Sequence, residues 1–139
     1  MRSSLRFPYV SVQNASYTAL RPLIPITLHH REFAQSTMGL LDTGADINVL
    51  PYPLGLSLGA VWEDQLTTVT GLSGNLANYE TRGVVVQATI GNLRSARLVF
   101  AWTRAENVPL ILGQTNFFME FSVCFYRSLN IIDVSLKGE

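Results

Sequence analysis

The residue of this sequence best placed for chemistry is an aspartate between apolar residues. Asp42 follows two leucines and precedes Thr-Gly in residues 40–51, LLDTGADINVLP. The apolar flanks predict an extended, half-buried segment, where an ionised carboxylate costs several kcal/mol unless it is paired or hydrogen-bonded. Asp42 therefore either caps a turn, for which Asp-Thr-Gly is well suited, or takes part in a reaction.

The alternation of side chains along an extended segment sets the neighbours of Asp42. Leu40, Asp42 and Gly44 would share one face, and Leu41 and Thr43 the other. Gly44 allows another backbone to approach closely, and Thr43 supplies a hydroxyl that can tie the loop to a group opposite it. These properties suit a carboxylate that is held rigidly for chemistry.

Composition limits the class of protein. With 139 residues the chain can bury one hydrophobic core, so we expect a single domain. Hydrophobic residues make up 47% of the chain and charged residues only 14%, which predicts that a partner covers part of the apolar surface and favours self-association. Ten basic residues balance ten acidic ones without clustering, so neither nucleic acid nor a membrane is an expected partner.

The expected location is the cytoplasm. Cys124 is the only cysteine, which excludes an internal disulfide and fits a reducing compartment. The first residues lack the apolar stretch of a signal peptide, and no segment is long enough to span a membrane.

Short β-branched and aromatic runs separated by turn residues predict an all-β domain. Residues 65–102 are typical of two linked hairpins, with turns at residues 71–74 and 91–92. Residues 114–121 are the one expected helix, and residues 122–134 a final hairpin that turns at residues 127–129. Residues 1–20 could form an outer strand, cover a dimer interface or be a removable pro-segment.

Four stretches in order carry a resemblance to a known family. The sequence LLDTGAD resembles the catalytic signature of the retropepsins, the retroviral-type aspartic proteases. TGLSGN at residues 70–75 is similar to the tip of that family's flap hairpin, and LILGQTN at residues 110–116 to the segment beside its catalytic loop. RPLIPITL at residues 21–28 is a weaker match to its first hairpin strand. The resemblance spans residues 21–121, and the residues after it look more like the C-terminal end of pepsin-type lobes.

The resemblance implies a retropepsin-like closed β-barrel with a flap hairpin and one short C-terminal helix, forming a single-lobe homodimer. It also implies an aspartic endopeptidase that needs no metal or cofactor. Its partners would be a second copy of the chain and an extended polypeptide substrate. The chemistry needs two carboxylates that share one proton. Of the four aspartates, Asp42, Asp46, Asp64 and Asp133, only Asp42 precedes Thr-Gly, so the second carboxylate is expected from Asp42 of another copy.

The resemblance also assigns roles to individual residues. The catalytic residues would be Asp42, Thr43, which would brace the two loops across the dimer axis, and Gly44. Asp46, together with Gly44, would bind the peptide backbone. The flap would comprise Gly71, Leu72, Ser73 and Gly74, and the side-chain pockets would be lined by Leu40, Ile47, Val49 and Ile111.

Two departures from the family pattern concern peptide binding and dimer strength. Gln114 stands where the family commonly has an arginine that supports the aspartate of Gly-Ala-Asp, so Asp46 needs another partner, for which Arg21 of the other subunit is a candidate. Ser73 replaces a common flap glycine. Two alternatives stay open: a non-catalytic peptide-binding or dimerisation module with the same fold, and a monomeric small-ligand barrel with a chance Asp-Thr-Gly.

Simpler interpretations suffice for the other polar and reactive residues. His29 and His30 are adjacent and would face opposite ways on a strand, so they are expected as solvated loop residues and not as joint metal ligands. Cys124 lies in a predicted buried strand, where it would act as a small hydrophobic residue. Residues 62–64, Trp-Glu-Asp, are expected to form a solvated turn.

Overall fold

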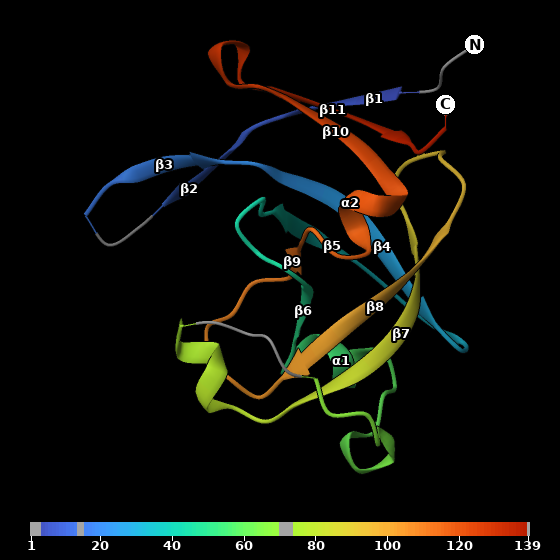
Figure 1. Cartoon of the computed structure of the whole chain (residues 1–139). Helices are drawn as coiled ribbons and strands as arrows, with labels where there is room; N and C mark the ends of the chain where they lie inside the picture. The colour runs from blue at the N-terminus through green and yellow to red at the C-terminus, as the bar shows by residue number, and fades with distance from the viewer. Residues whose placement is uncertain (1–3, 14–15, 70–73, 139) are drawn as a thin grey trace.

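The computed structural model describes residues 4–13, 16–69 and 74–138, and its centre is a closed β-barrel (Figure 1). The strands follow the order β4-β5-β9-β6-β8-β7, with β4 paired to β7. The pairs β5–β9 and β6–β8 are parallel and the other neighbours are antiparallel. The strands are β4 (Leu23–His30), β5 (Phe33–Leu41), β6 (Asn48–Pro51), β7 (Thr81–Thr89), β8 (Ala96–Thr103) and β9 (Ile111–Leu112).

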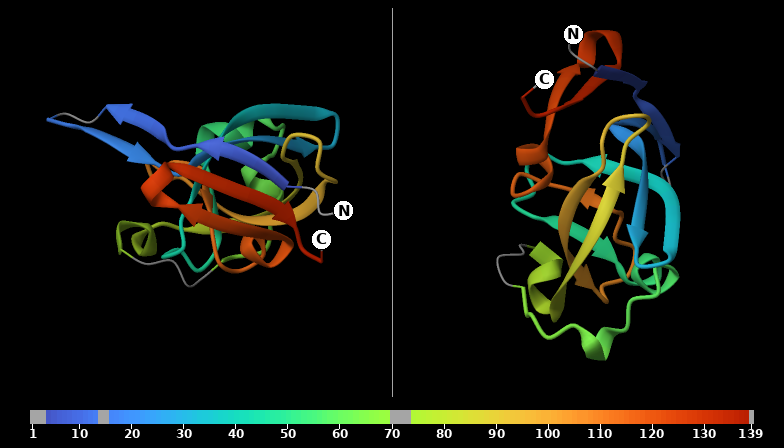
Figure 2. Two further views of the ribbon diagram at one scale, coloured as in Figure 1. Left: turned by 90° about the horizontal axis from the view of Figure 1, so that it is seen from above. Right: turned by 90° about the vertical axis from the view of Figure 1, so that its right-hand side faces the viewer.

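Two smaller sheets accompany the barrel. The first is antiparallel, with β11 (Ile131–Leu136) between β1 (Ser4–Pro8) and β10 (Phe121–Tyr126). Within the N-terminal residues, β1 is an outer strand of this sheet, which was one of the three alternatives for residues 1–20. The second sheet is a hairpin of β2 (Val10–Gln13) and β3 (Thr18–Arg21), which projects from the body of the molecule (Figure 2).

Side-chain alternation explains how the barrel strands bury their core. In β4, Ile24, Ile26 and Leu28 are at most 2% exposed, while Pro25 between them is exposed. The same period of two in β7 buries Val84 and Val86 and leaves Val85 outside. Because successive side chains point to opposite faces of the strand, burying one face fixes the register of each strand. The prediction of an all-β barrel domain is confirmed.

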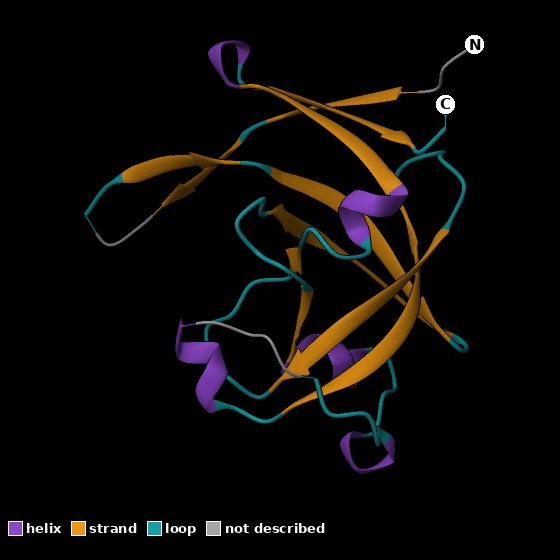
Figure 3. Cartoon of the chain, in the orientation of Figure 1, coloured by secondary structure: helices purple, strands orange, loops and turns teal. Residues whose placement is uncertain are grey.

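The helical segments are short and more numerous than the sequence predicted (Figure 3). They are α1 (Tyr52–Ser57), α2 (Phe117–Glu120) and three 3-10 turns, η1 (Trp62–Asp64), η2 (Gly74–Asn78) and η3 (Arg127–Leu129). The predicted start of the last helix at residue 114 was wrong, because Gln114 and Thr115 donate their backbone N–H groups to Ala45 and Asp46. Asn116 then has a φ of 83°, so α2 begins only at Phe117.

Of the two predicted hairpins in residues 65–102, only β7–β8 is regular. The segment before the flap pairs with β7 through a single bridge, Thr68 with Arg82, and a few backbone hydrogen bonds such as Val69 N–H to Thr81 O. The 3-10 turn η2 covers Gly74–Asn78, so it takes the place of the start of the strand that was predicted after the turn at residues 71–74. The final hairpin, β10–β11 through η3, forms as predicted.

Several predictions for single residues were wrong. Trp62 is 4% exposed and its ring packs 5.1 Å from that of Trp102, because the indole supplies apolar area that outweighs the charged residues after it. Cys124 is exposed, since its face of β10 points away from the barrel. His29 and His30 end β4 and do not lie in the loop, and His30 Nδ1 is 2.8 Å from Leu58 O.

Candidate active site

The end of β5 positions the carboxylate of Asp42. The Leu41 N–H donates to Pro22 O at 2.9 Å, and the Asp42 N–H donates to Leu112 O at 3.0 Å. The chain then turns, with Ala45 N–H donating to Asp42 O at 3.1 Å and Gly44 N–H donating to Asp42 Oδ1 at 2.9 Å. Asp42 is half-buried while Thr43 and Gly44 are exposed, so the loop presents a fixed carboxylate at the surface of the barrel.

The residues after β9 hold the far half of this loop. Gln114 N–H donates to Ala45 O at 2.9 Å and Thr115 N–H donates to Asp46 O at 2.7 Å. Gly113 lies so close to the loop that a Cβ atom would meet the carbonyl oxygens of Ile47 at 2.6 Å and Ala45 at 2.9 Å. Only glycine allows the two backbones to approach this closely, so the loop and β9 form one unit.

Asn48 is a buried positioning residue that the sequence analysis missed. Its side chain is fully buried, and its Nδ2 donates to Val99 O at 3.0 Å and to Asn116 Oδ1 at 3.2 Å. Its Oδ1 accepts a hydrogen bond from Gly113 N–H at 2.9 Å. Asn116 Oδ1 also accepts from Val99 N–H at 2.7 Å. This network joins β6, β8 and the segment after β9. It therefore fixes the strand that follows the Asp42 loop to the segment that packs against the loop.

Gln114 braces the Asp42 loop by a contact that the sequence did not predict. Its Nε2 donates to Thr43 O at 2.8 Å, so this residue supports the loop at the position where the family commonly has arginine. The carboxylate of Asp46 is exposed and forms no hydrogen bond or ion pair with another residue in the described ranges. Asp46 is therefore free to meet a group from outside the chain.

The predicted pocket residues gather around β9. Leu40 and Val49 both pair with Ile111, and Ile47 is bridged to Thr115. Leu40, Ile47 and Ile111 are half-buried, but Val49 is 2% exposed and offers a ligand almost no surface in the single chain. Of the predicted flap, Gly71, Leu72 and Ser73 lie outside the described residues, and Gly74 begins η2.

Comparison with protein families agrees with this geometry. A family model described as aspartyl protease matches residues 30–115, which include the Asp42 loop, β9 and Gln114. The chain belongs to the aspartyl protease family. The match spans more than half of the sequence, and the retropepsin-like resemblance is confirmed.

Two solved structures are similar to this aspartyl protease family member. A retropepsin-like aspartic protease from Rickettsia conorii superposes with a TM-score of 0.62 at 13% identity, covering 98% of this chain and 94% of that one. EIAV protease complexed with the inhibitor HBY-793 is 24% identical with a TM-score of 0.49, covering 73% of this chain and 86% of that one. The fold assignment rests on the Rickettsia structure. A comparison with curated proteins found no match.

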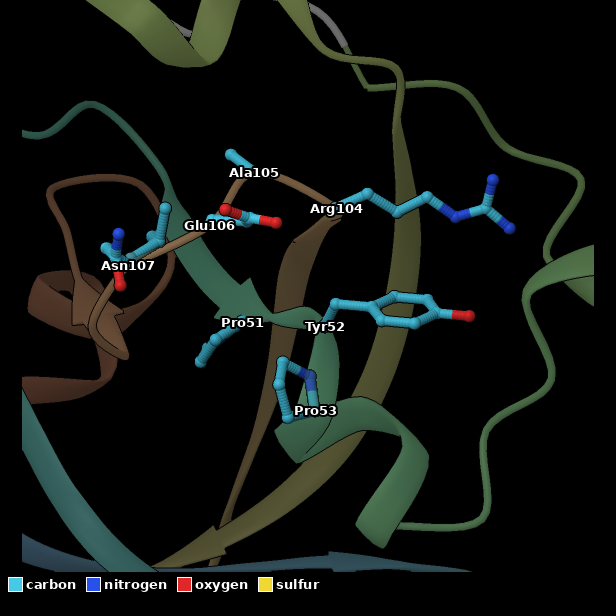
Figure 4. Close-up of a pocket in the computed structure, with 8 residues that line it drawn as sticks. Pro51, Tyr52, Pro53, Arg104, Ala105, Glu106 and Asn107 are labelled. Carbon is cyan, nitrogen blue, oxygen red and sulfur yellow. The ribbon is translucent and has the colours of Figure 1, made fainter.

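Two hollows flank the loop that leads into β9, and the sequence analysis missed both. One, of about 560 Å³, lies between residues 51–53 and residues 104–108 (Figure 4). The other, of about 540 Å³, lies between η2 with Tyr79 and residues 105–108. Residues 105–108 border both hollows. They end two positions before the LILG segment begins at Leu110, and this closeness was the signal in the sequence for them. Each hollow is large enough for side chains of a ligand.

Among the described residues, no helix is long and apolar enough to cross a membrane. No group of three or more His, Cys, Asp or Glu side chains gathers there in a way that could hold a metal ion.

Proposed function

We propose that this chain is an aspartic endopeptidase that acts as a homodimer. The observation that carries the proposal is the Asp42 carboxylate, held through Gly44 N–H at the end of β5 within an Asp-Thr-Gly loop of the aspartyl protease family. A capping aspartate in an ordinary turn would not need the bracing that Gln114, Asn48 and β9 give to this loop. We infer that the loop is built to hold a carboxylate in one orientation for a reaction.

The second carboxylate of the pair would come from Asp42 of another copy. Asp42 is the only aspartate of the sequence followed by Thr-Gly, so one chain supplies one such loop. A two-fold axis beside the loop would bring two identical carboxylates together, because a two-fold interface uses the same surface on both copies. In that arrangement the exposed hydroxyl of Thr43 would brace the two loops across the axis.

The two carboxylates would act on a water molecule held between them. The ionised member accepts a proton from the water as its oxygen attacks the carbonyl carbon of the peptide, and the protonated member donates a hydrogen bond to the carbonyl oxygen. Collapse of the tetrahedral intermediate breaks the C–N bond while the nitrogen receives the proton that the carboxylate took from the water, so the pair again holds one proton. Because the pair must carry one proton, we expect the highest activity on the acidic side of neutral.

The substrate would be an extended polypeptide. Gly44 and Asp46 would contact its backbone, because a strand-like peptide offers main-chain donors and acceptors. Leu40, Ile47, Val49 and Ile111 keep their proposed role around the cleaved bond, with Val49 contributing from beneath the surface. The flap residues Gly71, Leu72, Ser73 and Gly74 would close over the peptide and exclude water.

The two hollows beside residues 105–108 extend the proposed substrate site. We assign them to substrate side chains on the same side of the molecule as the Asp42 loop, where Figure 1 shows η2 and the connection into β9. A cytoplasmic location and a single domain over residues 1–139 belong to the same proposal. The single exposed thiol of Cys124 supports a reducing compartment.

Incubation with a broad peptide library over roughly pH 4 to 7 tests the proposal, with products identified by mass spectrometry. We expect cleavage by the native chain and none by Asp42→Asn, which keeps the size of the side chain and one oxygen to accept from Gly44 N–H but cannot share a proton. Circular dichroism and sedimentation must show the same fold and the same dimer for both proteins. A native dimer that binds peptides without cleaving any would contradict the enzyme and support the non-catalytic peptide-binding module.

A further inference from the structure

The hairpin of β2 and β3 forms no ladder with any other described strand. Its strands pair from Val10 with Arg21 to Gln13 with Thr18, and it forms a sheet of its own. In Figures 1 and 2 it extends away from the barrel and from the sheet of β1, β11 and β10 as a projecting arm. We call these two strands the arm. An isolated two-stranded hairpin is marginally stable in water, so the arm requires support from outside itself.

One face of the arm is apolar. Residues directly opposite each other in an antiparallel pair share a face, which places Val10, Val12 and Ala19 together with Arg21 at one end. The opposite face carries Ser11, Gln13, Thr18 and Leu20, and there Thr18 Oγ1 donates to Gln13 Oε1 at 2.7 Å. Val12 is 37% exposed on the apolar face. An amphipathic hairpin of this kind is built to be covered on one side.

The root of the arm lies beside the catalytic loop. Arg21 is followed by Pro22, whose carbonyl accepts the Leu41 N–H at 2.9 Å, and Leu23 pairs with Leu40. The arm thus joins the barrel next to Leu40 and Leu41, the residues that directly precede Asp42. Figure 1 shows it on the same side as the loop between β5 and β6, where the proposed two-fold axis must pass.

Charges at this side are complementary between two copies. Arg21, at one end of the apolar face of the arm, is exposed and forms no ion pair with any described residue. Asp46, in the proposed catalytic loop, is also exposed and forms no ion pair with any described residue. A second copy related by a two-fold axis would bring one cation and one anion from each chain to the same interface. This arrangement favours a second copy over an unrelated partner.

We propose that the arm is a dimer clamp, which crosses the two-fold axis and packs the face of Val10, Val12 and Ala19 on the second copy. This inference rests on the proposed homodimeric function and adds to it a contact surface outside the catalytic loop. Each arm contacts the other chain, so the interface covers the face of Val10, Val12 and Ala19 on both copies. The arm therefore stabilises the assembly in which the site is complete, without touching the reacting atoms.

A matched pair of substitutions tests the clamp. Val12→Asn places a neutral polar group on the apolar face, and Val85→Asn makes the same change on β7, where the valine is 40% exposed instead of 37%. Sedimentation should show that Val12→Asn raises the dimer dissociation constant at least about tenfold, while Val85→Asn leaves it within about twofold of the native value. Peptide cleavage by Val12→Asn should return at high protein concentration, which shows that the catalytic loop is intact.

Two further measurements separate the clamp from the proposed function. Asp42→Asn should remain dimeric while cleaving nothing, so loss of activity and loss of the dimer are read independently. Amide hydrogen exchange in residues 10–13 and 18–21 of the native chain should slow as protein concentration rises through the dissociation constant. An active native dimer with an unchanged dissociation constant in Val12→Asn, or with arm exchange independent of concentration, would overturn the clamp and leave the protease proposal standing.

Discussion

Asn48 shows how single side chains outside the reaction hold the Asp42 loop in place. Its amide group satisfies three partners at once: the carbonyl of Val99, the side chain of Asn116 and the N–H of Gly113. Gln114 adds a fourth, more exposed support through Thr43 O. The position of the Asp42 carboxylate depends on these amides, because its own hydrogen bond from Gly44 N–H lies within the loop and does not fix the loop relative to the barrel.

Substituting Asn48 by alanine should therefore destabilise the fold. The change leaves the buried Gly113 N–H without its acceptor, and we expect the free energy of unfolding to fall by about 2 to 3 kcal/mol. Urea denaturation at constant pH measures this loss. Asn92→Ala, on the exposed turn between β7 and β8, is the control and should change the free energy by less than about 0.5 kcal/mol. Equal effects of the two substitutions would refute the role given to the network.

At the level of single residues, the sequence predicts a catalytic role for Asp42 that stays a prediction, and it did not predict the residues that hold the Asp42 loop. Asp42, Thr43 and Gly44 form a contiguous motif whose chemistry is local. Asn48 and Asn116 are separated by 68 positions, and nothing in either neighbourhood shows that the two amides meet. A buried asparagine also has the same local pattern as one in a turn, so only the tertiary structure distinguishes them.

Among the elements, the two-residue strand β9 and the residues after it hold the Asp42 loop by backbone hydrogen bonds. Strand β9 lies between β5 and β6, pairing parallel with one and antiparallel with the other. The segment that follows β9 accepts no substitution of Gly113 without movement, since a Cβ there would collide with backbone carbonyls and not with a flexible side chain. The Asp42 loop and this segment must therefore shift together.

Gly113→Ala is expected to cost at least about 2 kcal/mol of stability and to reduce peptide cleavage by a larger factor than the folded fraction alone explains. Gly83→Ala in β7 is the matched control, because its nearest contacts would be at 3.7 Å and its stability should change by less than about 1 kcal/mol. Thermal unfolding and cleavage rates of both variants decide the matter. A Gly113→Ala protein with native stability and native rate would show that the close approach is not required.

Prediction at the level of elements succeeded where local pattern and tertiary packing agree. The alternation in β4 and β7 survives in the barrel, and so does the β10–β11 hairpin. It failed where tertiary bonds override local preference: hydrogen bonds from Gln114 and Thr115 delay the start of α2, and η2 replaces a strand after the flap. Helix α1 contains proline and glycine, which locally indicate a turn.

At the scale of the whole molecule, the low charge of the sequence and the exposed apolar side chains of the structure agree. A chain with 14% charged residues leaves apolar side chains exposed on the arm and at the chain's surface, among them Val12, Tyr17 and Met38. The proposed dimer would cover part of this area and would place two Asp42 loops together. The number of copies that the site needs is therefore the property that most directly tests the proposed chemistry.

Mixing native chain with Asp42→Asn at equal concentrations and constant total protein gives a direct count of the copies in the site. If the site needs one carboxylate from each of two chains, random exchange leaves about one quarter of the dimers fully native, and cleavage falls to about one quarter of the native rate. A chain that works alone would retain about half, because each native copy would act independently. The mixture must first be held near the dissociation constant until the rate is constant, so that subunits have exchanged. Native chain mixed with Val85→Asn is the control and should keep the full rate.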